Sequence, residues 1–148
     1  MKKEFITYFD EIELASTYRD AAEKCISQVE KIYDLTVEDI FVCTYLNEGH
    51  VDVTSLWIIG AEFLVECKDF VNSSNYDYVS FKNNLKYISI EMNGVDLDAD
   101  TYENDAMVKI YGSISSSGTL SCSLLACGKN CRKGIEVYRK YFVSNIIK

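Results

Sequence analysis

Hydrophobic positions follow a helical period near both ends of the chain. Between residues 9 and 33, apolar side chains recur every three or four positions, as on the buried face of a helix. This stripe consists of Ala15, Tyr18, Ala22, Cys25, Ile26, Val29, Ile32 and Tyr33. The same spacing returns in Ile135, Tyr138, Tyr141, Phe142 and Ile146. The pattern predicts one helix over 9–33 and another over 129–148, with Asn130 as the N-cap of the second.

The segment between these helices has the composition and spacing of β-strands. Apolar Ile88, Ile90 and Met92 alternate with more polar side chains, so one face of that strand is expected to be buried. Asn, Gly and Ser residues separate neighbouring candidates, and Ser115–Gly118 is expected to form a hairpin turn. Strands are predicted over 39–46, 51–59, 62–68, 77–81, 85–92, 106–114 and 118–127, with a long loop over 93–105.

These elements describe a single α+β domain of 148 residues. A chain of this length buries roughly 68–70% of its unfolded surface, which suffices for a core without disulfides or metals. The domain divides into a helical segment over 1–36, a β-rich body over 37–128 and the C-terminal helix over 129–148. Because short turns join neighbouring strands antiparallel, we expect an antiparallel seven-stranded barrel or a strongly bent sheet with two helices.

Two segments of the β-rich body resemble the pleckstrin-homology-like (PH-like) superfamily. Bacterial members often pair a strand and a Thr-Asp-x-x-Leu-type turn with a later Ser/Tyr-aromatic-x-x-Ile segment. Residues 56–65 look like the first, with Gly60-Ala61 in place of Thr-Asp, and residues 78–90 look like the second. The order of elements over about 37–146 is also similar to a PH-like barrel, in which the C-terminal helix would cover one open end.

The resemblance implies a module that binds lipids, peptides or proteins, although a fold does not fix a function. Members that bind phosphoinositides carry basic residues on the first two strands and in the loop that joins them. The corresponding segment here is Leu46-Asn47-Glu48-Gly49-His50, which contains no Lys or Arg. Recognition of lipid phosphates is therefore not expected, and a protein partner is.

Charge argues against two classes of partner. The chain has 15 basic and 23 acidic residues and a net charge of −8, which disfavours nucleic acids and anionic membranes. Residues 129–148 hold six Lys or Arg and one Glu, for +5, whereas residues 1–128 hold nine basic and 22 acidic residues, for −13. No stretch approaches the 18 apolar residues of a transmembrane helix, so membrane insertion is not expected.

Six cysteines are scattered through apolar surroundings, at positions 25, 43, 67, 122, 127 and 131. The N-terminal segment lacks the apolar region and cleavage site of a secretory signal, which favours a cytoplasmic location and reduced thiols. No Cys-x-x-Cys pair occurs, and His50 is remote from the cysteines in sequence. We therefore predict buried, reduced thiols and neither a metal site nor another cofactor.

The sequence contains no recognisable catalytic motif. His50 is the one imidazole that could activate a Ser or Cys nucleophile, and a Gly-x-Ser-x-Gly motif does not occur. Glycine-rich phosphate-binding motifs are missing as well. These features predict that the protein is not an enzyme.

The loop over 93–105 concentrates acidic side chains without any basic residue. Its acidic residues are Asp96, Asp98, Asp100, Glu103 and Asp105. Alternate carboxylates suit Ca²⁺, but an EF-hand loop would need Gly and Glu where this chain has Thr101 and Met107. A solvated acidic loop is therefore expected.

Two functions fit these features. The leading hypothesis is a small non-catalytic binding module that engages a protein partner through a sheet edge or a groove beside a helix. The alternative is an acidic inhibitor or immunity-type protein that blocks the basic site of a nucleic-acid enzyme, because complementary potential speeds association. A contiguous acidic face would favour the inhibitor, and a mixed face with an apolar groove would favour the module. The residues proposed for partner binding are Asp96, Asp98, Asp100, Glu103, Asp105, Arg132, Lys133, Arg139 and Lys140, which could also pair between two copies of the chain.

Overall fold

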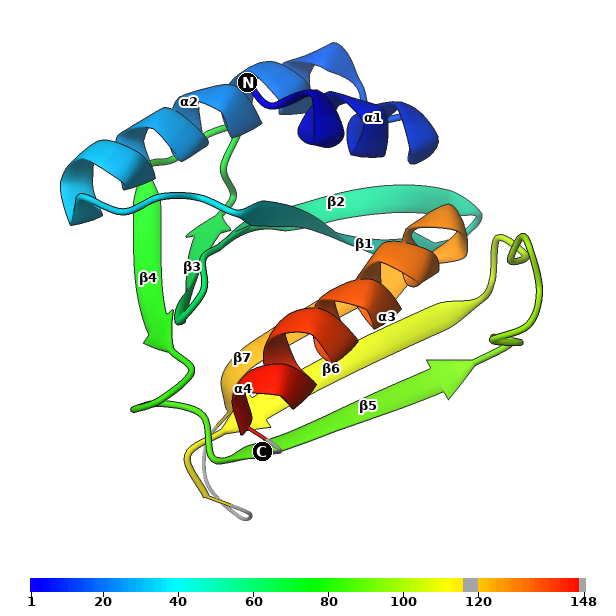
Figure 1. The fold of residues 1–148 in the computed structure, drawn as a ribbon. Coiled ribbons are helices and arrows are strands. Elements are labelled where there is room, and N and C mark those ends of the chain that lie inside the picture. The colour runs from blue at the N-terminus through cyan, green and yellow to red at the C-terminus, as the bar shows by residue number, and fades with distance from the viewer. Residues whose placement is uncertain (116–119, 147–148) are drawn as a thin grey trace.

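Seven antiparallel strands form two sheets in the computed structural model, which describes residues 1–115 and 120–146 (Figure 1). The first sheet has the order β1-β2-β3-β4, with β1 (Asp39–Asn47), β2 (His50–Ile59), β3 (Phe63–Lys68) and β4 (Asn75–Ser80). The second has the order β5-β6-β7, with β5 (Tyr87–Asn93), β6 (Met107–Ser113) and β7 (Leu120–Cys127). The α+β class and the predicted strands are confirmed, and their ends shift by only one or two residues. Most of the predicted hairpin turn at Ser115–Gly118 lies outside the described residues.

The two sheets do not close into the expected barrel. Within the described residues, no backbone ladder joins β4 to β5 or β7 to β1. Side chains occupy the place of a ladder partner along β1, because the Tyr8 hydroxyl accepts the Val42 N–H at 3.0 Å and the Asn130 amide donates to the Val42 carbonyl at 2.7 Å. These bonds satisfy both backbone groups of Val42 without a ladder partner from β7.

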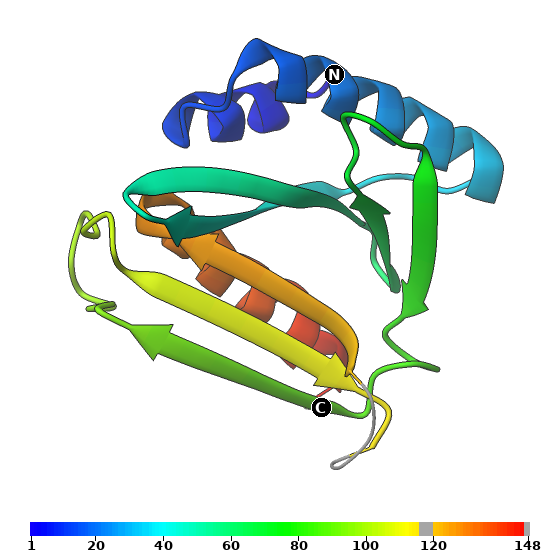
Figure 2. The ribbon, with the colours of Figure 1, turned by 180° about the vertical axis from the view of Figure 1, so that it is seen from behind.

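Helices flank both sheets. They are α1 (Lys3–Glu11), α2 (Ser16–Tyr33), the 3-10 turn η1 (Gly128–Asn130), α3 (Cys131–Val137), the π-helical segment η2 (Tyr138–Val143) and α4 (Ser144–Ile146). The two N-terminal helices cover the outer face of the first sheet, and α3 runs across the second (Figures 1 and 2). No helix in the described ranges is long and apolar enough to cross a membrane.

The helix predicted over 9–33 is in fact two helices. The chain leaves α1 after Glu11, and Glu13 adopts a φ of 56°, a left-handed conformation that an α-helix cannot contain. Arg19 stabilises the break, because it donates to the Leu14 carbonyl at 2.7 Å and pairs with Asp10 at 2.6 Å. The connection turns α1 back beside the start of α2 (Figure 1).

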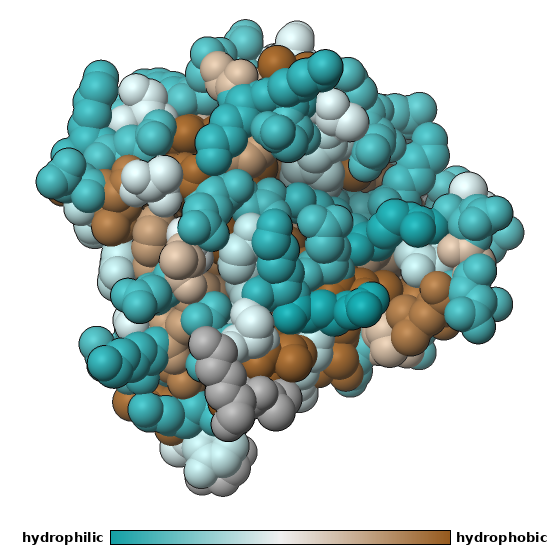
Figure 3. Space-filling view, in the orientation of Figure 1, coloured by the Kyte–Doolittle hydropathy of each residue, from teal (hydrophilic) through white to brown (hydrophobic). Residues whose placement is uncertain are grey.

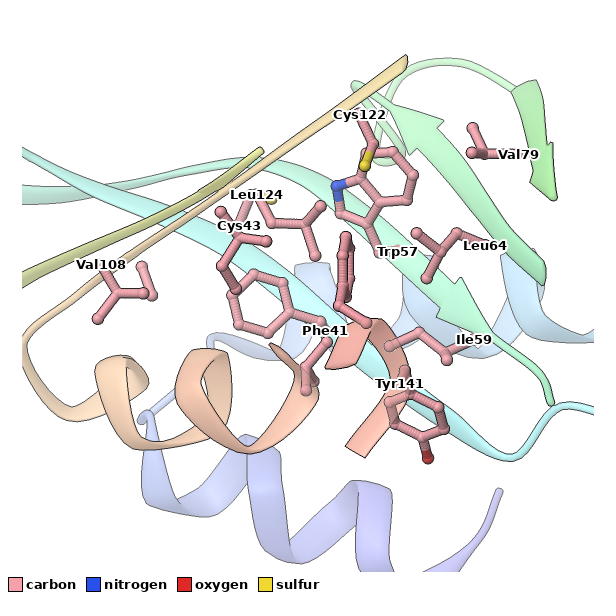
Figure 4. Close-up of a cluster of buried hydrophobic side chains, with 14 of the residues drawn as sticks. Phe41, Cys43, Trp57, Ile59, Leu64, Val79, Val108, Cys122, Leu124 and Tyr141 are labelled. Atoms are coloured by element: carbon pink, nitrogen blue, oxygen red, sulfur yellow. The ribbon is translucent and has the colours of Figure 1, made fainter. Parts of the chain in front are cut away.

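Two hydrophobic cores share the first sheet. One lies between the two sheets and the C-terminal helix, and it contains the buried side chains of Phe41 and Trp57 (Figure 4). The other lies between the N-terminal helices and the opposite face, and it contains Phe9 and Ile58. Where both faces of this sheet are buried, in the first half of β1, the second half of β2 and most of β3, the strands carry apolar runs and little alternation of apolar and polar residues.

The C-terminal helix widens into the π-helical segment η2. Within this segment two consecutive side chains, Tyr141 and Phe142, are buried in the core. The Phe142 ring packs edge-on against Phe81, with centroids 5.6 Å apart, and Tyr138 stacks on it at 5.9 Å. Burial of this stripe is confirmed for Tyr141 and Phe142, whereas Tyr138 and Ile146 are half-buried.

All six cysteines are buried and free, as predicted from their apolar surroundings. Burial is the largest cause that raises the thiol pKa of Cys43 to about 11 and those of Cys122 and Cys131 to about 12, from an ordinary value of 9.0. The folded state therefore holds these protons more tightly than the unfolded chain does. Their contribution to stability is complete below pH 9 and is lost as the pH rises toward 11–12.

We expect the free energy of unfolding to fall between pH 9 and 10, by at most about 1.4 kcal/mol per pH unit for each such thiol. Urea titrations in the presence of a reductant measure this slope. The Cys43→Ala/Cys131→Ala variant should be less stable at neutral pH but should lose stability less steeply over the same interval. Identical slopes in the two proteins would contradict the assignment to these thiols.

Candidate functional site

The acidic loop and the C-terminal helix meet at one end of the molecule (Figure 1). Residues 94–106 form a loop, as predicted, and Arg132 of α3 anchors it. The guanidinium donates to the Ala99 carbonyl at 3.2 Å and to the Asp100 carbonyl, and it lies 5.5 Å from the centre of the Tyr102 ring. The acidic loop and the basic helix, both predicted to bind a partner, are thus in contact with each other. Arg132 makes this contact with backbone carbonyls of the loop and not with its carboxylates.

The acidic side chains of this loop are exposed and spread apart. Within the described residues, none of the five forms an ion pair, and no group of three or more His, Cys, Asp or Glu side chains is placed to hold a metal. The Asp96 carboxylate accepts the Asp98 N–H at 3.0 Å, a local turn contact. Glu103 precedes β6 in an exposed turn, and Asp105 borders a different groove. The five carboxylates therefore do not converge on one point.

The four candidate basic residues divide into two groups. Lys133 is half-buried, with its ammonium 2.8 Å from Asp39 and 3.7 Å from Glu136, so it holds the helix in place and does not present a free charge. Arg132 is exposed but already contacts the loop. The remaining candidates, Arg139 and Lys140, are exposed on the same side of the helix as Arg132.

A groove of about 870 Å³ lies between this loop and the C-terminal helix, and we call it the α3 groove. Its lining residues are Leu97, Tyr102, Arg132, Ile135, Glu136, Arg139 and Lys140. Leu97 is 62% exposed, while Tyr102 and Ile135 are half-buried. In Figure 3, hydrophobic surface lies beside and below the helix, in the region where Figure 1 places the loop and β5. The groove combines apolar side chains with a rim of three cations and one carboxylate.

The strand that leads into the loop is incompletely covered. Within the described residues, β5 pairs with β6 alone, so its other edge has no strand neighbour. The helix α3 packs on β6, β7 and β1, whereas the inward side chains of β5 lie at the margin of the core. Ile88 and Ile90 are half-buried and Met92 is 42% exposed. The free edge of β5 therefore leads into the loop that lines the α3 groove.

A buried polar network fixes α3 against α1 and β1. The Tyr8 hydroxyl donates to Asn130 Oδ1 at 2.7 Å, and Asn130 Nδ2 donates to Thr44 Oγ1 at 2.9 Å as well as to the Val42 carbonyl. Thr44 Oγ1 also accepts the Cys127 N–H at 3.2 Å. The expected N-cap role of Asn130 is wrong, because its side chain makes no capping bond and points into the core instead. The wall of the α3 groove is thus rigidly supported.

Sequence reasoning missed several residues of this site. Leu97, the exposed apolar residue in an otherwise acidic loop, was a visible signal, and Tyr102 was another. The role of Asn130 had no signal, since it depends on residues 86 to 122 positions away in the chain.

Comparisons with known proteins do not assign a family. No family model matches the chain, and no curated protein matches it. Among solved structures it is similar to the C-terminal domain of an unknown protein from Leishmania infantum. That match has 8% identity and a TM-score of 0.43, and it covers 84% of this chain and 98% of the other. A likeness at this level carries no argument about function.

Proposed function

We propose that this chain is a non-catalytic binding module that holds a segment of a protein partner in the α3 groove. The observation that carries the proposal is the apolar surface of Leu97, Tyr102 and Ile135, left uncovered between an anchored loop and a rigidly held helix. Apolar side chains in a concave site with a polar rim are the usual anchor points of peptide recognition.

The architecture suits a binding module, although its two sheets do not close into the barrel that the PH-like resemblance implies. A four-stranded and a three-stranded antiparallel sheet are followed by a C-terminal helix that packs between them. The free edge of β5 adds a second contact mode, because an extended segment that leaves the groove can continue along it as an additional strand.

The charges around the groove favour the module over the acidic inhibitor. Arg132, Arg139 and Lys140 lie beside the acidic loop, so this face carries both signs. An inhibitor of a nucleic-acid enzyme would instead present one contiguous acidic face to a basic site. A partner segment with an apolar anchor and flanking acidic residues matches the cationic rim.

Matched variants test this proposal by affinity capture from the producing cells. Leu97→Asp places a charge in the α3 groove, and Ile32→Asp places one on α2, where the side chain is exposed to the same extent, 61% against 62%. Both proteins should fold, since surface substitutions usually change stability by less than about 0.5 kcal/mol. We expect wild type and Ile32→Asp to capture the same partner, and Leu97→Asp to bind it at least about 30-fold more weakly. Equal capture by all three baits would contradict the proposal.

A further inference from the structure

A second groove lies on the face of the second sheet that points away from α3. Its volume is about 570 Å³, and its lining comes from the end of the β1–β2 hairpin and from β6 and β7. Figure 2 shows the turn of this hairpin beside the end of β7. Cross-strand pairing places Met107 opposite Cys127, and Lys109 opposite Leu125, on that outer surface. Tyr45 of β1 forms part of the wall above them. We call this site the hairpin groove.

The hairpin groove is apolar along its length and differs in charge at its two ends. Tyr45 and Leu46 are 39% and 37% exposed, although both are large hydrophobic side chains. Asp105 lies just before β6 and Lys109 lies within it. These two residues are four positions apart, which is at most about 13 Å, because Asp105 lies in the turn before the extended residues of β6.

Lys109 is the cation among the residues that line this groove. It is half-buried, and within the described residues it forms no ion pair. Glu91 lies opposite Lys109 on β5, but that carboxylate accepts a long hydrogen bond from Tyr111 at 3.5 Å. An ammonium that borders an apolar groove without a paired anion attracts a ligand carboxylate.

We propose that the hairpin groove binds an amphipathic monocarboxylate, with its apolar chain along Met107 and Leu125 and its carboxylate at Lys109. The volume falls within the range of small-molecule sites, which are mostly apolar with a few polar groups that fix orientation. The separation of Asp105 and Lys109 sets an upper limit of about ten carbons for an extended chain between them, since each bond advances about 1.3 Å. Asp105 disfavours a second carboxylate at the far end, which selects a ligand with one anionic group.

This inference does not depend on the proposed function, because the hairpin groove and the α3 groove share no lining residue. The probes are decanoate, decan-1-ol and decanedioate, each titrated below its aggregation threshold and followed by calorimetry. We expect decanoate to bind saturably with one site per chain, and about tenfold more tightly than decanol. Decanedioate should bind more weakly than decanoate, because Asp105 disfavours its second carboxylate.

Three variants locate the site. Lys109→Gln should remove the preference for decanoate over decanol, while Lys24→Gln, an exposed lysine on α2, should leave it unchanged. Leu125→Asp should weaken the binding of both probes by at least tenfold. Leu46→Asp, at a more exposed wall position, gives the same test if Leu125→Asp does not fold. Absence of saturable decanoate binding, or binding that Lys109→Gln and the Asp variants leave unchanged, would overturn the proposal.

Discussion

Replacing Phe142 with alanine is expected to lower the free energy of unfolding by about 3–5 kcal/mol. The Phe142 ring is fully buried in the core that joins the two sheets, where it contacts Phe81 and Tyr138. Its removal leaves a cavity that the surrounding strands and the π-helical segment cannot fill without losing their own packing. Equilibrium urea unfolding, followed by Trp57 fluorescence and by circular dichroism, measures the loss.

A graded control separates cavity formation from a general disturbance of the helix. Phe142→Leu removes less volume and should cost clearly less than Phe142→Ala. Arg139→Ala, at an exposed position of the same helix, should change stability by less than about 0.5 kcal/mol. A loss below about 1 kcal/mol for Phe142→Ala would show that the helix does not form part of the core.

Replacing Asn130 with leucine is expected to cost about 3 kcal/mol, because it removes buried hydrogen bonds to Val42, Thr44 and Tyr8. The Val42 carbonyl loses its donor, and the Tyr8 hydroxyl loses its acceptor. The same urea titrations measure the effect. Asn72→Leu, at an exposed asparagine in the turn after β3, is the matched control and should be nearly neutral.

A double-mutant cycle with Tyr8→Phe tests whether these groups act as one network. Tyr8→Phe alone leaves the Val42 N–H unsatisfied and removes the donor to Asn130. Because the two substitutions disturb shared partners, the double variant should lose less stability than the sum of the single losses. Strictly additive losses would indicate that Tyr8 and Asn130 contribute independently.

The sequence predicted the strands well because local signals define them. Alternation marks β5, which has one face at the core margin, and turn residues separate the other strands. Closure of the barrel could not be predicted from such local signals, because it depends on which groups form hydrogen bonds with Val42 at the edge of β1. Tyr8 and Asn130, from opposite ends of the chain, satisfy it here. Their convergence on Val42 is a tertiary property that no local pattern encodes.

At the N-terminus, the long apolar stripe of α2 obscured the separate helical pattern of α1. The long stripe of α2 extends smoothly backward to residue 9, which favoured a single helix. The spacing of Phe5, Tyr8 and Phe9, all buried on α1, was an equally helical signal at the very start of the chain. The two helices are separated by a left-handed conformation at Glu13, and no glycine stands there to predict the break from the sequence.

The candidate site was predictable in its charges but not in its apolar part. Arg132, Arg139 and Lys140 stood out because they cluster near the C-terminus, and they do border the α3 groove. Lys133 belongs to the same sequence cluster, but helical geometry turns it toward Asp39 and away from solvent. The groove itself arises from the packing of a loop against a helix, so its shape cannot be inferred from either segment alone.

Photo-crosslinking in the producing cells tests the central claim most directly. A photoreactive side chain in place of Leu97 projects into the α3 groove, and one in place of Ile32 projects from α2 with nearly the same exposure. If the groove holds a partner segment, irradiation should give one discrete crosslinked protein from position 97 and none from position 32. Crosslinking that is absent from position 97, or that yields the same products from both positions, would contradict the account.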